Sequence, residues 1–156
     1  MRADNAEHND ESAEGLRIAV VASAFNASIT KGLTAGAVDW LETANAHEVF
    51  VVQAPGAFEL PLVAQRLASM GYDAVICLGA VVEGDTDHYE HVAHRTSEGL
   101  MRVQLDTGIP VSFGVLVVTE REHAIERSKP GSGNKGMEAA KAGVAAANTL
   151  RRLGPK

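Results

Sequence analysis

The sequence predicts a three-layer α/β/α fold built on a four-stranded parallel sheet. Four apolar runs of strand length alternate with helix-length segments along the 156 residues, and strands separated by helices become parallel neighbours through right-handed crossovers. A hydrophobic content of 46% at this length is enough for one sizeable core, whereas the chain is too short for two ordinary domains. We therefore expect one domain, over residues 15–156.

The expected elements follow in order along the chain. Residues 1–14 are charged, polar and poor in aromatic side chains, which predicts a flexible acidic tail. Four buried strands are expected, at Arg17–Ser23, Glu48–Gln53, Ala74–Val82 and Val111–Thr119. The alanine-rich stretch Lys135–Leu153 predicts a last helix with cations near its carboxyl end. This order is typical of flavodoxin-like sheets, in which ligands collect beyond the carboxyl ends of the strands.

Charge and composition argue against several classes of protein. The net charge of -6 argues against a nucleic-acid binder, because such a protein needs a basic face to displace counterions. No apolar stretch approaches the length of a membrane span, and the first residues are too polar for a signal peptide, so we expect a cytoplasmic protein. The single cysteine, Cys77, lies in an apolar run and is expected to be a buried hydrophobe rather than a catalytic thiol.

Candidate ligand-binding residues follow the first two strands. The turn that contains Phe25 and Asn26 lacks the glycines of a phosphate-cradling loop. Phe25 could stack on a planar heterocycle, although an isolated aromatic residue is more often part of the core. Glu59 is either a carboxylate favoured by a helix dipole or an acceptor for sugar-like hydroxyls. In the second interpretation, the backbone groups of Ala57 and Phe58 pair with the edge of a heterocycle.

The segment after the third strand is the most informative. Gly84 permits close approach of a ligand, and Asp85 or Thr86 is expected to cap the helix that begins there. The free N–H groups at the amino end of that helix form a seat for a phosphate. His88 lies in the expected first turn, where its imidazole can accept and return a proton.

Two further sets of side chains raise the question of ion binding. His88, His91 and His94 are three residues apart, but neither a cysteine nor a His-Glu-x-x-His arrangement accompanies them, so we expect no metal site. Arg127 and Lys135 flank a helix-breaking Pro-Gly-Ser-Gly run and need not share a face. Arg127 could clamp a phosphate and Lys135 could add a point charge, whereas each alone would more often be a solvated surface cation.

In their order and spacing, these motifs together resemble the lumazine synthase family from the first strand to the last helix. The matching pieces are Phe25-Asn26 with Ile29-Thr30, Pro55-Gly56-Ala57-Phe58-Glu59, Gly84 with Thr86 and His88, Pro110-Val111 with Phe113-Gly114-Val115-Leu116, Glu126-Arg127, and Gly133-Asn134-Lys135-Gly136. The resemblance implies a transferase of riboflavin biosynthesis. It would condense 5-amino-6-(D-ribitylamino)uracil with 3,4-dihydroxy-2-butanone 4-phosphate to give 6,7-dimethyl-8-ribityllumazine, phosphate and water. It implies no cofactor, and it requires no Schiff-base lysine because the substrate's own amine forms the imine.

The resemblance also implies a role for each matching residue. Phe25 would stack on the pyrimidinedione, and His88 would shuttle protons. The remaining residues of the substrate pocket would be Asn26, Ala57, Phe58, Glu59, Ala80, Val81 and Val82. Asp85 and Thr86 would offer backbone N–H groups to the ketose phosphate. Arg127 would clamp that phosphate, and Lys135 would assist near the anion.

Assembly follows from the position of Phe113, which lies near the start of the fourth expected strand. At about 3.3 Å per residue it sits roughly 20 Å from the strand end at Thr119, too far to reach its own subunit's cleft. If Phe113 caps the pyrimidine, as the resemblance implies, a neighbouring subunit must supply it, and Arg127 and Lys135 could come from that neighbour too. The resemblance implies a homo-pentamer with active sites at subunit interfaces, which could extend to a 60-subunit shell or dock a riboflavin synthase.

Two positions depart from the family's pattern. Glu83 stands where members commonly carry a basic residue, and Lys129-Pro130-Gly131-Ser132-Gly133 replaces a Gly-Thr-Lys-type turn common in shell-forming members. Two other functions therefore stay open, namely a non-catalytic module that binds a flavin or lumazine and a shell protein with vestigial activity. The presence of both Arg127 and His88 argues against the first of these, because ring binding alone needs neither.

Overall fold

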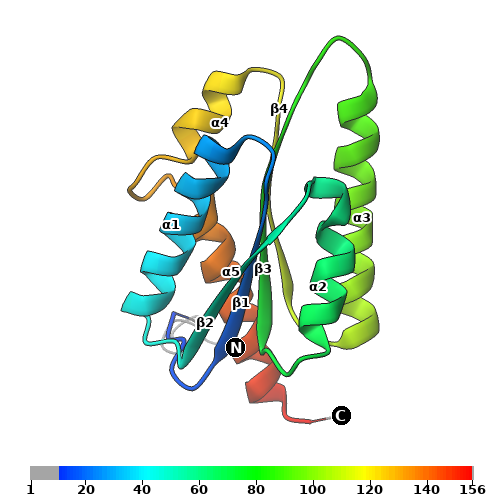
Figure 1. The fold of residues 1–156 in the computed structure, drawn as a ribbon. Coiled ribbons are helices and arrows are strands. Elements are labelled where there is room, and N and C mark those ends of the chain that lie inside the picture. The colour runs from blue at the N-terminus through cyan, green and yellow to red at the C-terminus, as the bar shows by residue number, and fades with distance from the viewer. Residues whose placement is uncertain (1–10, 156) are drawn as a thin grey trace, which may run out of the picture.

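A computed structural model describes residues 11–155, and residues 1–10 and 156 lie outside the described part. The elements in chain order are β1 (Arg17–Ser23), α1 (Ala27–Thr43), β2 (Glu48–Ala54), the 3-10 turn η2 (Ala57–Glu59), α2 (Leu60–Ala68), β3 (Ala74–Val82), α3 (His88–Thr107), β4 (Val111–Val118), α4 (Arg121–Arg127) and α5 (Lys135–Leu153) (Figure 1). The strands form one sheet in the order β2-β1-β3-β4, and every pairing is parallel.

Helices cover both faces of this sheet, so the predicted three-layer α/β/α fold is confirmed (Figure 1). On one face, Ile18 and Ile76 of the central strands pack with residues of α1, α4 and α5. On the other face, Val21 and Val75 pack with residues of α2 and α3. The two sets separate because successive side chains of a strand point to opposite faces of the sheet. Cys77 is buried as predicted, and this burial raises the pKa of its thiol.

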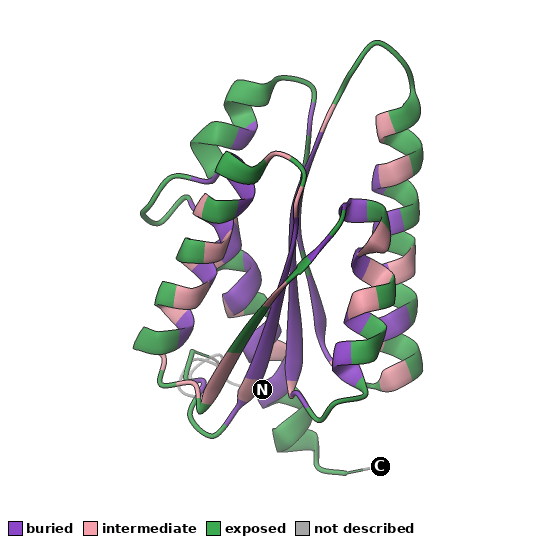
Figure 2. Cartoon of the chain, viewed as in Figure 1, coloured by how far each residue is buried: buried purple, intermediate pink, exposed green. Residues whose placement is uncertain are grey.

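The edge strand β2 differs from the prediction that all four strands are buried. Within β2 only Ala54 is buried, while Phe50 and Val51 are 39% and 46% exposed. Figure 2 shows the contrast with the buried strands at the centre of the sheet. β2 has only β1 as a neighbour, so one of its edges and part of its faces lack cover. An apolar run reveals strand length but not the strand's place in the sheet, which is why the prediction failed here.

The amino-terminal segment also departs from the prediction where it is described. Ala13 is fully buried, and its backbone N–H donates to the carbonyl of Ala44 at 2.8 Å. The carbonyl of Ser12 accepts a hydrogen bond from the side-chain amide of Asn148 at 2.8 Å. The prediction of a flexible tail as far as Glu14 is therefore wrong for residues 12–14. The reason is that tertiary backbone contacts hold this polar stretch, and composition alone cannot reveal them.

The helices α1 and α5 approach each other closely through glycines. A Cβ placed on Gly136 of α5 would lie 1.9 Å from the carbonyl oxygen of Leu33 in α1. In the same way α1 approaches the end of α4, since a Cβ on Gly32 would lie 2.3 Å from the carbonyl oxygen of Ser128. Asn134 caps α5, because its side chain accepts a hydrogen bond from the backbone N–H of Met137 at 3.0 Å. α5 has the bounds that the sequence predicted, Lys135–Leu153.

The parallel strands bring three loops to one end of the sheet. The carboxyl ends of β1, β2 and β3 meet there, and the segments that lead into α1, α2 and α3 lie around them (Figure 1). The carboxyl edge of the sheet is therefore the expected place for a ligand.

None of the helices over residues 11–155 combines the length and apolarity that crossing a bilayer requires.

Candidate functional site

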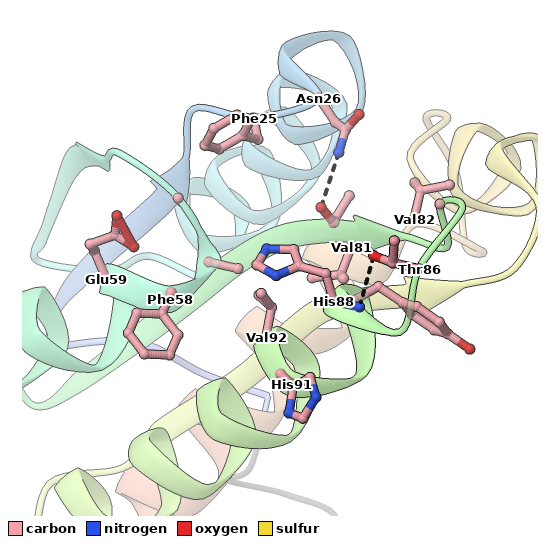
Figure 3. A pocket seen from close by; sticks show the side chains of 15 residues that line it. Phe25, Asn26, Phe58, Glu59, Val81, Val82, Thr86, His88, His91 and Val92 are labelled. Atoms are coloured by element: carbon pink, nitrogen blue, oxygen red, sulfur yellow. Dashed lines mark hydrogen bonds between the residues drawn. The ribbon is translucent and has the colours of Figure 1, made fainter.

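A pocket of about 640 Å³ opens at this carboxyl edge (Figure 3). Its volume is in the usual range for small-molecule sites. Most of the predicted site residues line it, namely Phe25, Asn26, Ala57, Phe58, Glu59, Ala80, Val81, Val82, Thr86 and His88. They come from the β1–α1 turn, η2, the end of β3 and the start of α3, so four separate segments of the chain converge on one cavity.

Phe25 is a surface aromatic residue rather than a core residue. It is 71% exposed and lines the pocket. A Cβ placed on Gly56 would lie 3.2 Å from two ring carbons of Phe25, so the ring rests against a backbone position without a side chain. An exposed aromatic face with support from one side is suited to stacking on a planar heterocycle.

Asn26 forms the turn between β1 and α1. Its backbone is left-handed, with φ 58° and ψ 51°, a conformation that asparagine tolerates better than most residues. Its side-chain Nδ2 donates to the carbonyl of Ala80 at 3.1 Å, which ties the turn to the end of β3 (Figure 3). The turn that carries Phe25 is therefore attached to the sheet beside it.

The loop after β2 supplies the opposite wall. Ala57 is buried and its carbonyl accepts a hydrogen bond from Thr96 Oγ1 of α3 at 3.1 Å, which fixes η2 against that helix. Phe58 is 63% exposed, and Glu59 is half-buried in the single turn of η2. Figure 3 shows both side chains on the same side of the pocket. The carboxylate of Glu59 is thus available to accept hydrogen bonds from a ligand.

α3 begins at His88, later than the predicted cap at Asp85 or Thr86. Asp87 is the N-cap residue, and its side chain makes no capping hydrogen bond. Thr86 Oγ1 instead accepts from the backbone N–H of His88 at 3.3 Å. The His88 ring extends into the pocket (Figure 3). Asp85 lies between two lining residues but is not itself in the lining over residues 11–155.

The histidines of α3 do not converge. His91 joins the pocket lining, and its Nε2 lies 3.5 Å from a carboxylate oxygen of Asp87. His94 is exposed and lies two turns of the helix from Asp87. Over residues 11–155, no group of three or more histidine, cysteine, aspartate or glutamate side chains is placed to hold a metal ion.

Besides Asp85, three more predicted site residues lie outside the pocket lining of the described chain. Phe113 is 41% exposed and pairs in register with Cys77, whereas the pocket lies near Val82 at the far end of the same strand pair. Arg127 is the last residue of α4, and Lys135 is the first residue of α5 and pairs with a glutamate of the same helix. The sequence predicted that Phe113 lies too far along its strand to reach its own subunit's cleft, and its observed place agrees with that prediction.

The sequence analysis did not assign Tyr89, His91 and Val92 to the site, and it missed the contact of Arg121 with Asn26. Tyr89 and Val92 line the pocket beside His88, and the helical spacing of His88 and Val92 could have revealed the second of these. Arg121 donates from Nη1 to Asn26 Oδ1 at 2.7 Å. No local signal reports that contact, because its partners are 95 residues apart in the chain.

The rim near the start of α3 is acidic. Desolvation raises the pKa of Tyr89, and the carboxylates of Glu83 and Glu90 raise it further because they disfavour a phenolate. Glu83 follows the last residue of β3 and precedes the loop that enters α3. Attraction for an anionic ligand must therefore come from backbone N–H groups or from cations outside this rim.

Comparisons with known proteins give one similar solved structure and one matching family model. A de novo designed Rossmann fold protein shares 18% sequence identity, with a TM-score of 0.40 over 71% of this chain and 92% of that chain. The family model for 6,7-dimethyl-8-ribityllumazine synthase matches residues 15–151, which include all four strands and nearly all of α5. The chain therefore belongs to the lumazine synthase family.

Proposed function

We propose that the protein condenses 5-amino-6-(D-ribitylamino)uracil with 3,4-dihydroxy-2-butanone 4-phosphate, giving 6,7-dimethyl-8-ribityllumazine, phosphate and water. The observation that carries the proposal is the convergence of Phe25, Glu59 and His88 on one pocket in a chain of this family. A stacking ring, a hydroxyl acceptor and a proton carrier are the groups that this reaction would use.

The pyrimidine would occupy the part of the pocket between the β1–α1 turn and η2. Phe25 would stack on the pyrimidinedione, and the backbone groups of Ala57 and Phe58 would pair with its edge. Glu59 would accept hydrogen bonds from the ribityl hydroxyls. The apolar wall of Ala80, Val81 and Val82 at the end of β3 would exclude water from the remaining face.

The ketose phosphate would lie beside it, at the amino end of α3. Free backbone N–H groups at a helix N-terminus favour an anion, and Asp85 and Thr86 would supply them from the loop that enters the helix. The imidazole of His88 would take up and return protons as the imine forms and phosphate departs. Most of the rate enhancement would come from holding the two reactants side by side.

An absorbance assay for lumazine formation with both substrates tests this function. We expect turnover by the unaltered protein, and we expect His88→Ala to lower kcat by about 100-fold without abolishing it, the size of one general acid–base contribution. Binding of a flavin or lumazine without any turnover would favour the binding-module function instead. Complete loss of activity in a folded His88→Ala protein that still binds both substrates would contradict the emphasis on positioning.

We further propose that the site is completed by a second subunit of a homo-pentamer. The support is that Phe113, Arg127 and Lys135 lie away from the pocket of their own chain, although the resemblance to the family implies that all three would lie near the substrates. In a closed ring with head-to-tail interfaces, the surface of one subunit that carries them would face the pocket of the next. Light scattering of the purified protein would measure the number of subunits.

Mixed assemblies test the shared site directly. His88→Ala and Arg127→Ala proteins are each expected to be nearly inactive, but co-expression should restore activity because about one interface in four then combines two intact residues. A pair of variants that both affect the pocket's own chain, His88→Ala with Phe25→Ala, is the matched control and should give no recovery. Failure of the first mixture to recover, despite mixed assemblies shown by two affinity tags, would contradict a shared site.

A further inference from the structure

Arg121 connects two parts of the chain at the edge of the pocket. It is the first residue of α4, and its Nη1 donates to Asn26 Oδ1 at 2.7 Å while its Nη2 lies 3.5 Å from Ser28 Oγ. A hydrogen bond from a guanidinium is charge-assisted and is stronger than one between neutral groups. Arg121 itself is not in the pocket lining over residues 11–155.

The contact fixes which way the Asn26 amide points. A guanidinium only donates, so the oxygen of the amide must face Arg121, and a carbonyl only accepts, so the amide nitrogen must face Ala80. These two partners together exclude the flipped orientation. One N–H of the amide remains, and Asn26 lines the pocket, so this side chain can offer a ligand a donor.

The same contact holds the turn from which Phe25 projects. Asn26 adopts a left-handed backbone conformation, and Phe25 is 71% exposed immediately before it. The backbone of Gly56 supports one side of the Phe25 ring. Arg121, which contacts both Asn26 and Ser28, restrains the other side of the turn.

We propose that Arg121 is a positioning residue for the pyrimidine part of the pocket. It holds Asn26 so that the remaining amide N–H is donated to a carbonyl or hydroxyl oxygen of the ribitylaminopyrimidine, and it keeps Phe25 in stacking position. This inference rests on the proposed function. It assigns Asn26 a single role, as a donor, and it assigns Arg121 an effect on the pyrimidine rather than on the phosphate.

Kinetics of Arg121 variants test the proposal. Arg121→Ala should raise the KM for the pyrimidine by about tenfold, the effect of losing one charge-assisted hydrogen bond. The KM for the ketose phosphate and kcat should change less than about twofold, since the anion would be bound elsewhere. Arg121→Lys should recover most of the affinity, because its ammonium group is nearly as far from the backbone and can still donate to Asn26 Oδ1. Arg95→Ala removes another exposed arginine that pairs with a single side chain, Glu98, and serves as the control.

A second variant tests whether the Asn26 amide itself donates a hydrogen bond to the ligand. Asn26→Asp keeps an acceptor for Arg121 but removes both N–H groups, the one donated to Ala80 and the one left for a ligand, so it should raise the KM for the pyrimidine at least as much as Arg121→Ala does. Calorimetric binding of an unreactive pyrimidinedione that carries a ribityl chain gives a readout independent of turnover, and its dissociation constant should rise in parallel. Thermal unfolding of each variant shows whether the fold is kept.

Each result decides between specific interpretations. An increase in the KM for the ketose phosphate would show that Arg121 binds the anion. A lower Tm with unchanged KM values would show that Arg121 only stabilises the fold. Either outcome overturns the inference while leaving the proposed function standing. If the unaltered protein neither binds the pyrimidinedione nor forms lumazine, the proposed function itself fails.

Discussion

Replacing Gly136 with alanine is expected to lower the free energy of unfolding by roughly 3 kcal/mol, at the upper end of the usual range for overpacked cores. The added Cβ would lie 1.9 Å from the carbonyl oxygen of Leu33 and 2.6 Å from its carbonyl carbon. These are backbone atoms of α1, which cannot rotate away as a flexible side chain can. The two helices would have to separate, and the buried contacts between α1 and α5 would weaken.

Urea unfolding followed by circular dichroism measures this effect, with Gly133→Ala as the matched control. Gly133 lies three residues earlier, and a Cβ there would meet nothing within 4 Å. We expect Gly133→Ala to change the stability by no more than about 0.5 kcal/mol, as is usual for surface positions. Equal midpoints for the two variants would show that α1 and α5 are not in close backbone contact.

Asn134→Ala is expected to cost about 3 kcal/mol, from a lost helix cap worth about 1 kcal/mol and from buried carbonyls left without a donor. The side chain is almost completely buried, and its oxygen accepts from the N–H of Met137. Its nitrogen lies within hydrogen-bonding distance of three carbonyl oxygens, those of Gly32 at 3.1 Å, Ser128 at 3.1 Å and Lys129 at 3.0 Å.

Asn134→Ser separates the two contributions to this loss. Serine can still cap α5, but it is too short to reach all three carbonyls, so we expect it to recover only about 1 kcal/mol of the lost stability. The midpoint of thermal unfolding, measured together with urea unfolding, would give the order native, Ser, Ala. If the serine variant were as stable as the native protein, the carbonyl contacts would contribute nothing.

The sequence predicted the fold because its main signals are local. Apolar runs of strand length, separated by helix-length segments, are sufficient to place four parallel strands, and the bounds of β1, β3 and α5 were predicted correctly. The exposure of Phe50 and Val51 could not be predicted, because the position of β2 at the sheet edge depends on the pairing order. The packing of Ala13 likewise depends on partners far along the chain.

The same distinction applies to the candidate site. Residues that follow strand ends, such as Phe25, Glu59 and His88, could be predicted, since parallel strands bring their carboxyl ends to one edge. The contact between Arg121 and Asn26 could not, because Arg121 belongs to no motif and its flexible side chain reaches a residue 95 positions away in the chain. The roles of Phe25, Asn26, His88 and Arg121 are predictions that the variants described above would test.

The buried amide of Asn134 has a consequence beyond stability. It holds the carbonyls of Ser128 and Lys129, which directly follow Arg127, and it caps the helix that begins with Lys135. In a ring whose sites are shared, both cations would serve the adjoining protomer. Loss of the Asn134 side chain would then lower the activity of the site on the neighbouring subunit, while the pocket of the altered subunit itself would stay intact.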